Sequence, residues 1–196
     1  MNMLASLHLV AHASTRAMRT GRFPDDDPLD ARGFAEAAAI RDQWDKTSAS
    51  IVLCSPARCA RQTADALGLG ARVDDALRDV DYGSWRGMRL HDLARTLPAD
   101  LGTWIGNPSA SPHGGESFVD VLRRIGAWLE RLPSASDIVA ITHAAVIRTA
   151  IVHVQRAEAA AISRIDVAPL SCTTFTRSPG GWILATGCDG RHDALP

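Results

Sequence analysis

The sequence lacks the features that mark membrane, secreted or nucleic-acid-binding proteins. None of its apolar runs approaches the roughly 20 residues that a transmembrane helix needs. The net charge is −1, so no excess of one sign favours attraction to nucleic acid or to a membrane surface. The apolar start has no basic stretch of the kind that opens a signal peptide, and it soon reaches His8 and His12. We therefore expect a cytoplasmic protein that binds neither nucleic acid nor membrane.

Cysteine and lysine are also scarce. The four cysteines are Cys54, Cys59, Cys172 and Cys188, and no two have the close spacing typical of metal ligands. In a domain of this size they favour a reduced interior over a disulfide framework. Lys46 is the single lysine, and the resulting bias towards arginine carries little functional weight because genome composition can produce it.

The 196 residues suit one domain, over residues 1–196, with a sizeable core. Short apolar runs predict strands at 7–11, 51–54, near 73 and at 138–142, and a terminal β-hairpin of 172–176 and 182–185 around Gly180-Gly181. Helical patterns cover 30–44, 55–67, 90–104 with a break near Pro98, 116–132, 144–154 and a short stretch at 157–161. Alternating strands and helices indicate an α/β fold, a three-layer α/β/α sandwich with a mostly parallel sheet.

Two of these strands deliver a histidine to their carboxyl ends. The run Leu7–Ala11 precedes His12, and the run Ile138–Thr142 precedes His143. Both runs are typical of buried parallel strands. Ligands of open α/β sheets bind outside the carboxyl ends of the strands. We therefore expect both imidazoles to face one substrate.

Further short stretches accompany these histidines in a fixed order. They are Ala-His-Ala-Ser-Thr at 11–15, Pro-Leu-Asp-Ala-Arg-Gly at 28–33, Ser-Pro-Ala-Arg-Cys-Ala-Arg-Gln-Thr-Ala at 55–64, Leu-Arg-Asp at 77–79 with Gly-Ser-Trp-Arg-Gly at 83–87, Gly-Glu-Ser at 115–117 and Thr-His-Ala-Ala-Val-Ile-Arg at 142–148. In type and order they resemble the motifs of the histidine phosphatase superfamily. That resemblance implies the phosphoglycerate mutase-like fold.

The resemblance also implies a mechanism without metal or cofactor. His12 matches the nucleophile that attacks phosphorus, forming a phosphohistidine that water then hydrolyses. Asp79 matches the general acid that protonates the leaving oxygen, although Asp81 is a local alternative. His143 matches the second pocket histidine, which donates to the phosphoryl oxygens. Thr15, Glu116 and Ala144 stand at motif positions beside the substrate, and Glu116 could instead favour the start of its helix.

The departures from the motifs concern charge. Ala11 and Cys59 stand where the family has the two arginines that bind phosphate, and Ala13 and Ala144 replace two glycines. Cys59 could be a reactive thiol at a helix N-terminus or a small buried side chain.

We expect other arginines to supply the missing charge. Arg58 follows the start of the same helix, where Arg61 also lies, and Arg16, Arg19 and Arg22 lie in the loop after His12. For Arg148, which also matches a motif position, we expect a structural ion pair.

These features predict a phosphomonoester hydrolase that acts on a small phosphorylated metabolite through phospho-His12. The loss of both arginines leaves an alternative open, a pseudophosphatase that binds an anionic ligand or partner without turnover. The expected small-molecule partner is a phosphorylated substrate or inorganic phosphate. A mutase that transfers the phosphate to an acceptor is a third reading. The terminal hairpin offers a surface through which two subunits could form a homodimer.

Overall fold

A computed structural model of the chain describes residues 5–44 and 49–185. Lys46 and Cys188 lie outside the described residues. No described helix combines the length and the hydropathy that a membrane crossing requires.

The centre of the fold is a six-stranded sheet in the order β3-β2-β4-β1-β5-β6. The pairs β3–β2, β2–β4 and β4–β1 are parallel, whereas β5 and β6 join in antiparallel fashion, which confirms a mostly parallel sheet. The strands are β1 (Ser6–Ala11), β2 (Ile51–Cys54), β3 (Arg72–Val73), β4 (Ile138–Thr142), β5 (Cys172–Ser178) and β6 (Gly181–Leu184). The last two form the expected hairpin, in which Gly181 adopts a φ of 120° that favours glycine.

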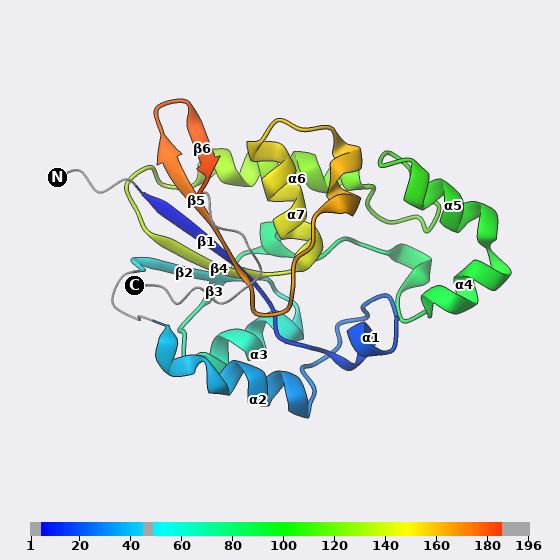
Figure 1. Cartoon of the computed structure of the whole chain (residues 1–196), viewed down its shortest axis with the longest axis horizontal. Helices are drawn as coiled ribbons and strands as arrows, with labels where there is room; N and C mark the ends of the chain where they lie inside the picture. Colours follow the sequence, from blue (N-terminus) through cyan, green and yellow to red (C-terminus); the bar gives the residue numbers. More distant parts are fainter. Residues whose placement is uncertain (1–4, 45–48, 186–196) are drawn as a thin grey trace.

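Helices cover both faces of the sheet, so the predicted three-layer sandwich is confirmed (Figure 1). One face packs against α6 (Phe118–Arg131) and α7 (Ala144–Val154), and the other against α2 (Ala31–Ala39) and α3 (Arg58–Ala66). Successive side chains of β1 point to opposite faces of the sheet, which explains the two hydrophobic cores. Leu7 and Leu9 belong to the core under α6 and α7, and Val10 belongs to the core under α2 and α3.

The remaining helices are short and lie mainly beyond the carboxyl ends of the parallel strands (Figure 1). They are α1 (Arg16–Arg19), α4 (Leu90–Thr96) and α5 (Pro98–Gly106), with 3₁₀ turns η1 (Arg41–Gln43), η2 (Asp75–Leu77), η3 (Gly83–Trp85) and η4 (Ala159–Arg164). Pro98 starts α5, which explains the expected break.

Three local predictions need correction. The segment after His12, expected to be a loop, contains α1, because the Thr15 side chain accepts a hydrogen bond from the Met18 amide and caps a single turn. The helix expected to reach Trp44 ends at Ala39 and continues as a 3₁₀ turn. The short helix expected at 157–161 is a 3₁₀ turn at Ala159–Arg164.

The register of β1 and β4 places the two strand-end histidines together. Ala11 pairs with Thr142, so His12 and His143 follow at the same level of the sheet. The His12 amide continues the ladder by donating to the Thr142 carbonyl at 2.9 Å. The carboxyl ends of two adjacent buried strands thus fix both residues by backbone hydrogen bonds.

Gly33 of α2 links the helical layer to the segment after His12. A Cβ atom at this position would lie 2.1 Å from the Ser14 carbonyl oxygen, so α2 approaches the backbone closely only because residue 33 is glycine.

We predict that Gly33→Ala destabilises the protein by about 1–3 kcal/mol, because the added methyl group must push Ser14 away from α2. Urea unfolding would measure the effect. Gly102→Ala in α5 is the matched control, because no atom lies within 4 Å of its added Cβ, and it should be neutral or slightly stabilising. Equal stability of the two variants would contradict the prediction.

Candidate active site

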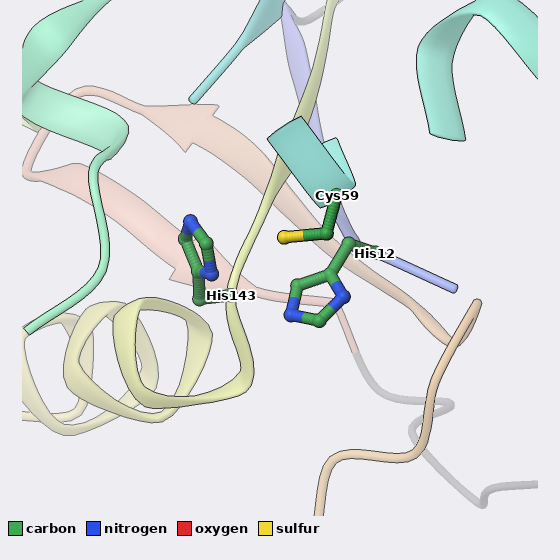
Figure 2. Close-up of side chains that lie close together, drawn as sticks. All are labelled: His12, Cys59 and His143. Carbon is green, nitrogen blue, oxygen red and sulfur yellow. The ribbon is translucent and has the colours of Figure 1, made fainter. Parts of the chain in front are cut away.

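The imidazoles of His12 and His143 lie against each other, with ring centroids 5.0 Å apart and an interplanar angle of 68°. Figure 2 shows both side chains beside Cys59. His12 Nδ1 lies 2.8 Å from the Ala13 carbonyl oxygen, which can only accept, so Nδ1 carries the proton. The Nε2 atom of neutral His12 therefore holds a free lone pair.

His143 is positioned by Ser55. The Ser55 hydroxyl lies 2.8 Å from His143 Nε2, and it also accepts a hydrogen bond from the Ala57 amide at 3.2 Å. The other ring nitrogen, Nδ1, is buried and makes no hydrogen bond within the described residues. Its nearest charged neighbour is Asp79, whose Oδ2 lies 3.4 Å away.

Burial controls the ionisation of all three groups. Burial lowers the pKa of His12 to about 4, with a further contribution from His143, and burial lowers the pKa of His143 to about 3. Burial likewise raises the pKa of Asp79 to about 6, against the opposing effects of the Val80 amide and of nearby positive charge. Near neutral pH both imidazoles are uncharged, and Asp79 holds its proton far more readily than an exposed aspartate.

A cavity of about 400 Å³ opens in front of these three residues. Its wall carries carboxylates from Asp25, Asp26, Asp27, Asp79 and Asp81, and guanidinium groups from Arg22, Arg78, Arg86 and Arg148. Thr15, Cys59 and Ala144 also line it. The site is therefore a mixed-charge cavity with two histidines at its base.

Most of the cavity arginines already have protein partners. Arg78 bonds to Asp75 at 3.0 Å and to Glu116 at 2.9 Å, and Arg86 bonds to Asp81 at 2.8 Å. Arg22 donates to the Gly87 carbonyl at 2.8 Å.

Arg148 differs from these three. It makes no ion pair with any residue that the structure describes, and its Nε is buried without a hydrogen-bond partner. The ion pair that the sequence led us to expect is thus not found among residues 5–44 and 49–185. Arg148 is thus the cavity arginine for which neither an ion pair nor a side-chain hydrogen bond is found in the described part of the chain.

The structure brings together five of the eight predicted site residues. His12, Asp79, His143, Thr15 and Ala144 all line the cavity, whereas Arg58, Arg16 and Glu116 do not. Arg58 lines a separate pocket with Arg61, and its amide donates to Asp26 at 2.8 Å. Glu116 accepts from Arg78 and Arg124 and from the Asp81 amide, which holds together the loop that carries Asp79.

Cys59 and Trp85 are both buried. Burial raises the pKa of the Cys59 thiol to about 12, so its position near the start of α3 does not make it a thiolate. Trp85 packs with Phe23, Tyr82 and Trp104 in a separate aromatic cluster, which gives this tryptophan a role in packing.

Sequence reasoning missed Ser55, Tyr82, Arg86 and the acidic residues at 25–27 as parts of the site. Ser55 stood inside a recognised motif, and that was the available signal for its contact with His143. The acidic residues carried no such signal, because their position depends on how the segment after His12 folds over the cavity.

The raised pKa of Asp79 predicts a cost in stability. Well below pH 3.8 the carboxyl is protonated in both folded and unfolded protein, but between its ordinary value of 3.8 and about 6 mainly the folded protein holds the proton. Stability therefore falls as the pH rises through this window. Asp79→Asn removes the charge and should stabilise the fold at pH 7.5 by on the order of 1–3 kcal/mol.

Urea unfolding of the wild type and of Asp79→Asn at pH 7.5 and at pH 4 would test this effect. The quantity to compare is the difference in the free energy of unfolding between the two proteins at each pH. The gain should shrink at pH 4, where wild-type Asp79 is largely neutral. A gain of the same size at both pH values would show that ionisation of Asp79 is not the cause.

Comparison with known proteins shows which family and which characterised phosphatases the chain is similar to. The chain matches the model of the histidine phosphatase superfamily (branch 1) over residues 7–189. It is 26% identical to phosphoserine phosphatase 1 of Hydrogenobacter thermophilus over 136 residues, which cover 66% of this chain and 64% of the relative. It is 33% identical to glucosyl-3-phosphoglycerate phosphatase of Mycobacterium tuberculosis over 103 residues, which cover 50% of this chain and 46% of the relative. The chain thus spans less than two thirds of either relative.

Solved structures agree on the fold. A phosphoserine phosphatase mutant from Entamoeba histolytica, in complex with phosphoserine, superposes with a TM-score of 0.84 over 93% of this chain and 96% of that chain, at 19% identity. Because the family model covers nearly the whole described chain, from β1 to the terminal hairpin, the protein belongs to the histidine phosphatase superfamily.

Proposed function

We propose that the protein hydrolyses a small phosphomonoester through a phosphohistidine at His12. The observation that carries the proposal is the hydrogen bond from His12 Nδ1 to the Ala13 carbonyl. It leaves the Nε2 lone pair unprotonated at the base of the cavity, and the low pKa of His12 keeps it so near neutral pH. A neutral, oriented imidazole is what nucleophilic attack on phosphorus requires.

In the first step His12 Nε2 bonds to phosphorus as the bond to the ester oxygen breaks. Asp79 gives its proton to that oxygen, so the leaving group departs as an alcohol. In the second step water attacks the phosphohistidine, its proton passes to Asp79, and inorganic phosphate leaves with His12 regenerated. A pKa of about 6 suits Asp79 to both giving and accepting this proton near neutral pH.

Ser55 can hold His143 in the tautomer that phosphoryl transfer requires. The Ser55 hydroxyl accepts from the Ala57 amide and can donate its single proton to His143 Nε2. His143 Nδ1 then carries the proton and, with no hydrogen-bond partner among the described residues, is free to donate to a phosphoryl oxygen. This places a hydrogen-bond donor where negative charge spreads during the transfer.

We propose that Arg148 and the start of α7 supply the positive charge that the motif arginines would otherwise provide. Ala144 and Ala145, the first residues of α7, line the cavity, and the free amides of a helix N-terminus attract anions. Arg148 lies one turn further along α7. The aspartates of the cavity wall disfavour a second strongly negative group on the substrate, which supports a small compound with a single phosphate.

Phosphate release from an aryl phosphate in the presence of a chelator tests the proposed reaction. His12→Ala removes the nucleophile, so we expect release to fall by about 10³-fold or more. His8→Ala is the matched control, because His8 lies four residues earlier on β1 and its ring contacts Thr174 at 3.0 Å rather than the cavity. Equal background rates for wild type and His12→Ala would instead favour a protein that binds an anion without turnover.

Arg148→Gln tests the source of the positive charge. A hydrogen bond to a charged group contributes about 1.5–3 kcal/mol, so kcat/KM should fall by about 10- to 150-fold. Arg123→Gln is the control, because Arg123 is exposed on α6 and pairs with Asp120. Unchanged kcat/KM in Arg148→Gln would exclude this arginine from phosphate binding.

We further propose a single domain over residues 1–196, which is supported by the one continuous sheet from β3 to β6. Free thiols at Cys54 and Cys59 support a cytoplasmic location.

The net charge of −1 supports a protein without nucleic-acid partners. A homodimer through the terminal hairpin is supported by β6, which lies at the end of the sheet and exposes Ile183 by 52%.

A further inference from the structure

Three metal-ligating side chains converge at the base of the cavity. His12 follows β1, Cys59 lies in the first turn of α3, and His143 follows β4. One donor atom from each, a ring nitrogen or the sulfur, lies within 4.8 Å of the other two. Figure 2 shows the Cys59 sulfur directed towards the gap between the two rings. Imidazole nitrogen and thiolate sulfur are the donors that zinc prefers in proteins.

Both histidines have a nitrogen available for a metal. His12 Nδ1 is occupied by the Ala13 carbonyl, so Nε2 is the free donor. His143 Nδ1 is buried and without a hydrogen bond in the described chain, in a residue that is only 3% exposed. A buried polar atom without a partner is rare in proteins and needs an explanation. Coordination of a cation would satisfy this nitrogen.

The surroundings also resemble those of a zinc centre. Each ring has its second nitrogen held by a protein oxygen, from Ala13 and from Ser55, in the manner that orients ligating histidines. In the other neutral tautomer of His143, which differs from the one proposed for phosphoryl transfer, Nε2 carries the proton and donates it to the Ser55 hydroxyl. Nδ1 then has a lone pair for the metal. Asp79 Oδ2, 3.4 Å from His143 Nδ1, adds negative charge beside the position of a cation.

The distances between the three donor atoms are close to those in a zinc site. Zinc bonds of 2.0–2.3 Å in a tetrahedron place neighbouring donors about 3.3–3.8 Å apart. One donor atom of each residue lies within 4.8 Å of those of the other two, so modest side-chain rotations would bring three donors into this range. All three residues line the cavity, which leaves the fourth coordination position open to it.

We propose that His12, Cys59 and His143 form a zinc site with three protein ligands and an open fourth position. On binding, the Cys59 thiol loses its proton to solvent and its sulfur bonds to the metal. The metal takes the Nε2 lone pair of His12. Where the proposed function holds, zinc and phosphoryl transfer therefore exclude each other, and zinc is a reversible inhibitor.

Cobalt titration of the untagged, metal-free full chain tests the site directly. Co²⁺ bound to a thiolate gives a sulfur-to-metal absorption band in the near ultraviolet. We expect this band to saturate at one equivalent of Co²⁺ and to disappear when Zn²⁺ is added. Cys59→Ala should lack the band and bind Zn²⁺ at least about tenfold more weakly, since even partners outside the ligand shell are worth 10- to 100-fold.

Cys54→Ala is the matched control. Cys54 is buried on β2, only 2% exposed, and should leave the cobalt spectrum unchanged. Absence of the band in the wild type, or its persistence in Cys59→Ala, would overturn the proposal. The readout is independent of turnover, and phosphate release is assayed with a chelator, so failure of the zinc site and failure of the proposed reaction give separate results.

Discussion

The parallel pairing of β1 with β4 is the interaction on which the site depends. The pair is buried in the middle of the sheet, between β2 and β5, and its register sets Ala11 against Thr142. The backbone bond from His12 to Thr142 extends the ladder by one residue and fixes where each histidine leaves the sheet. A slip of one residue would turn each side chain to the opposite face, so burial on both faces protects the geometry of the site.

Burial of the site has two opposing consequences. It keeps both imidazoles neutral and raises the pKa of Asp79, which are the protonation states that the proposed nucleophile and acid require. It also makes an isolated anion costly to bind, so the positive charge around the phosphate becomes decisive. Arg148 is the cavity arginine without a partner among the described residues, whereas Arg78 and Arg86 are neutralised by Glu116 and Asp81.

Cys59 gives the site a second possible chemistry. An arginine at position 59 would repel a cation. The Cys59 thiol, beside the imidazoles of His12 and His143, instead offers a cation three donor groups. In the proposed zinc site, the cysteine at this motif position therefore supplies a metal ligand where the family motif has a phosphate-binding arginine. In these two proposals the phosphoryl group and the metal ion compete for His12, because its Nε2 atom has a single lone pair.

Much of the fold was predictable from local pattern. The apolar runs of β1, β2 and β4 and the amphipathic repeat of α6 are contiguous in the sequence, and their burial requires little more than their own periodicity. The motifs likewise placed His12, Asp79 and His143, which the structure gathers in one cavity. The end of α2 and the turn of α1 were not predictable, since caps and tertiary contacts decide where a short helix stops or starts.

The arrangement of charge around the histidines required the tertiary structure. The sequence predicted Arg58, Arg16 and Glu116 as substrate-binding residues. In the structure Arg58 lines a separate pocket, and Glu116 accepts hydrogen bonds from Arg78 and Arg124. The cysteine spacing gave no sign of a metal site, because its donors come from three distant segments that only the sheet brings together. The sequence by itself determined which strands form and which histidines end them, since these depend on neighbours along the chain. The tertiary structure decided which side chains share the cavity, because that depends on how distant segments pack.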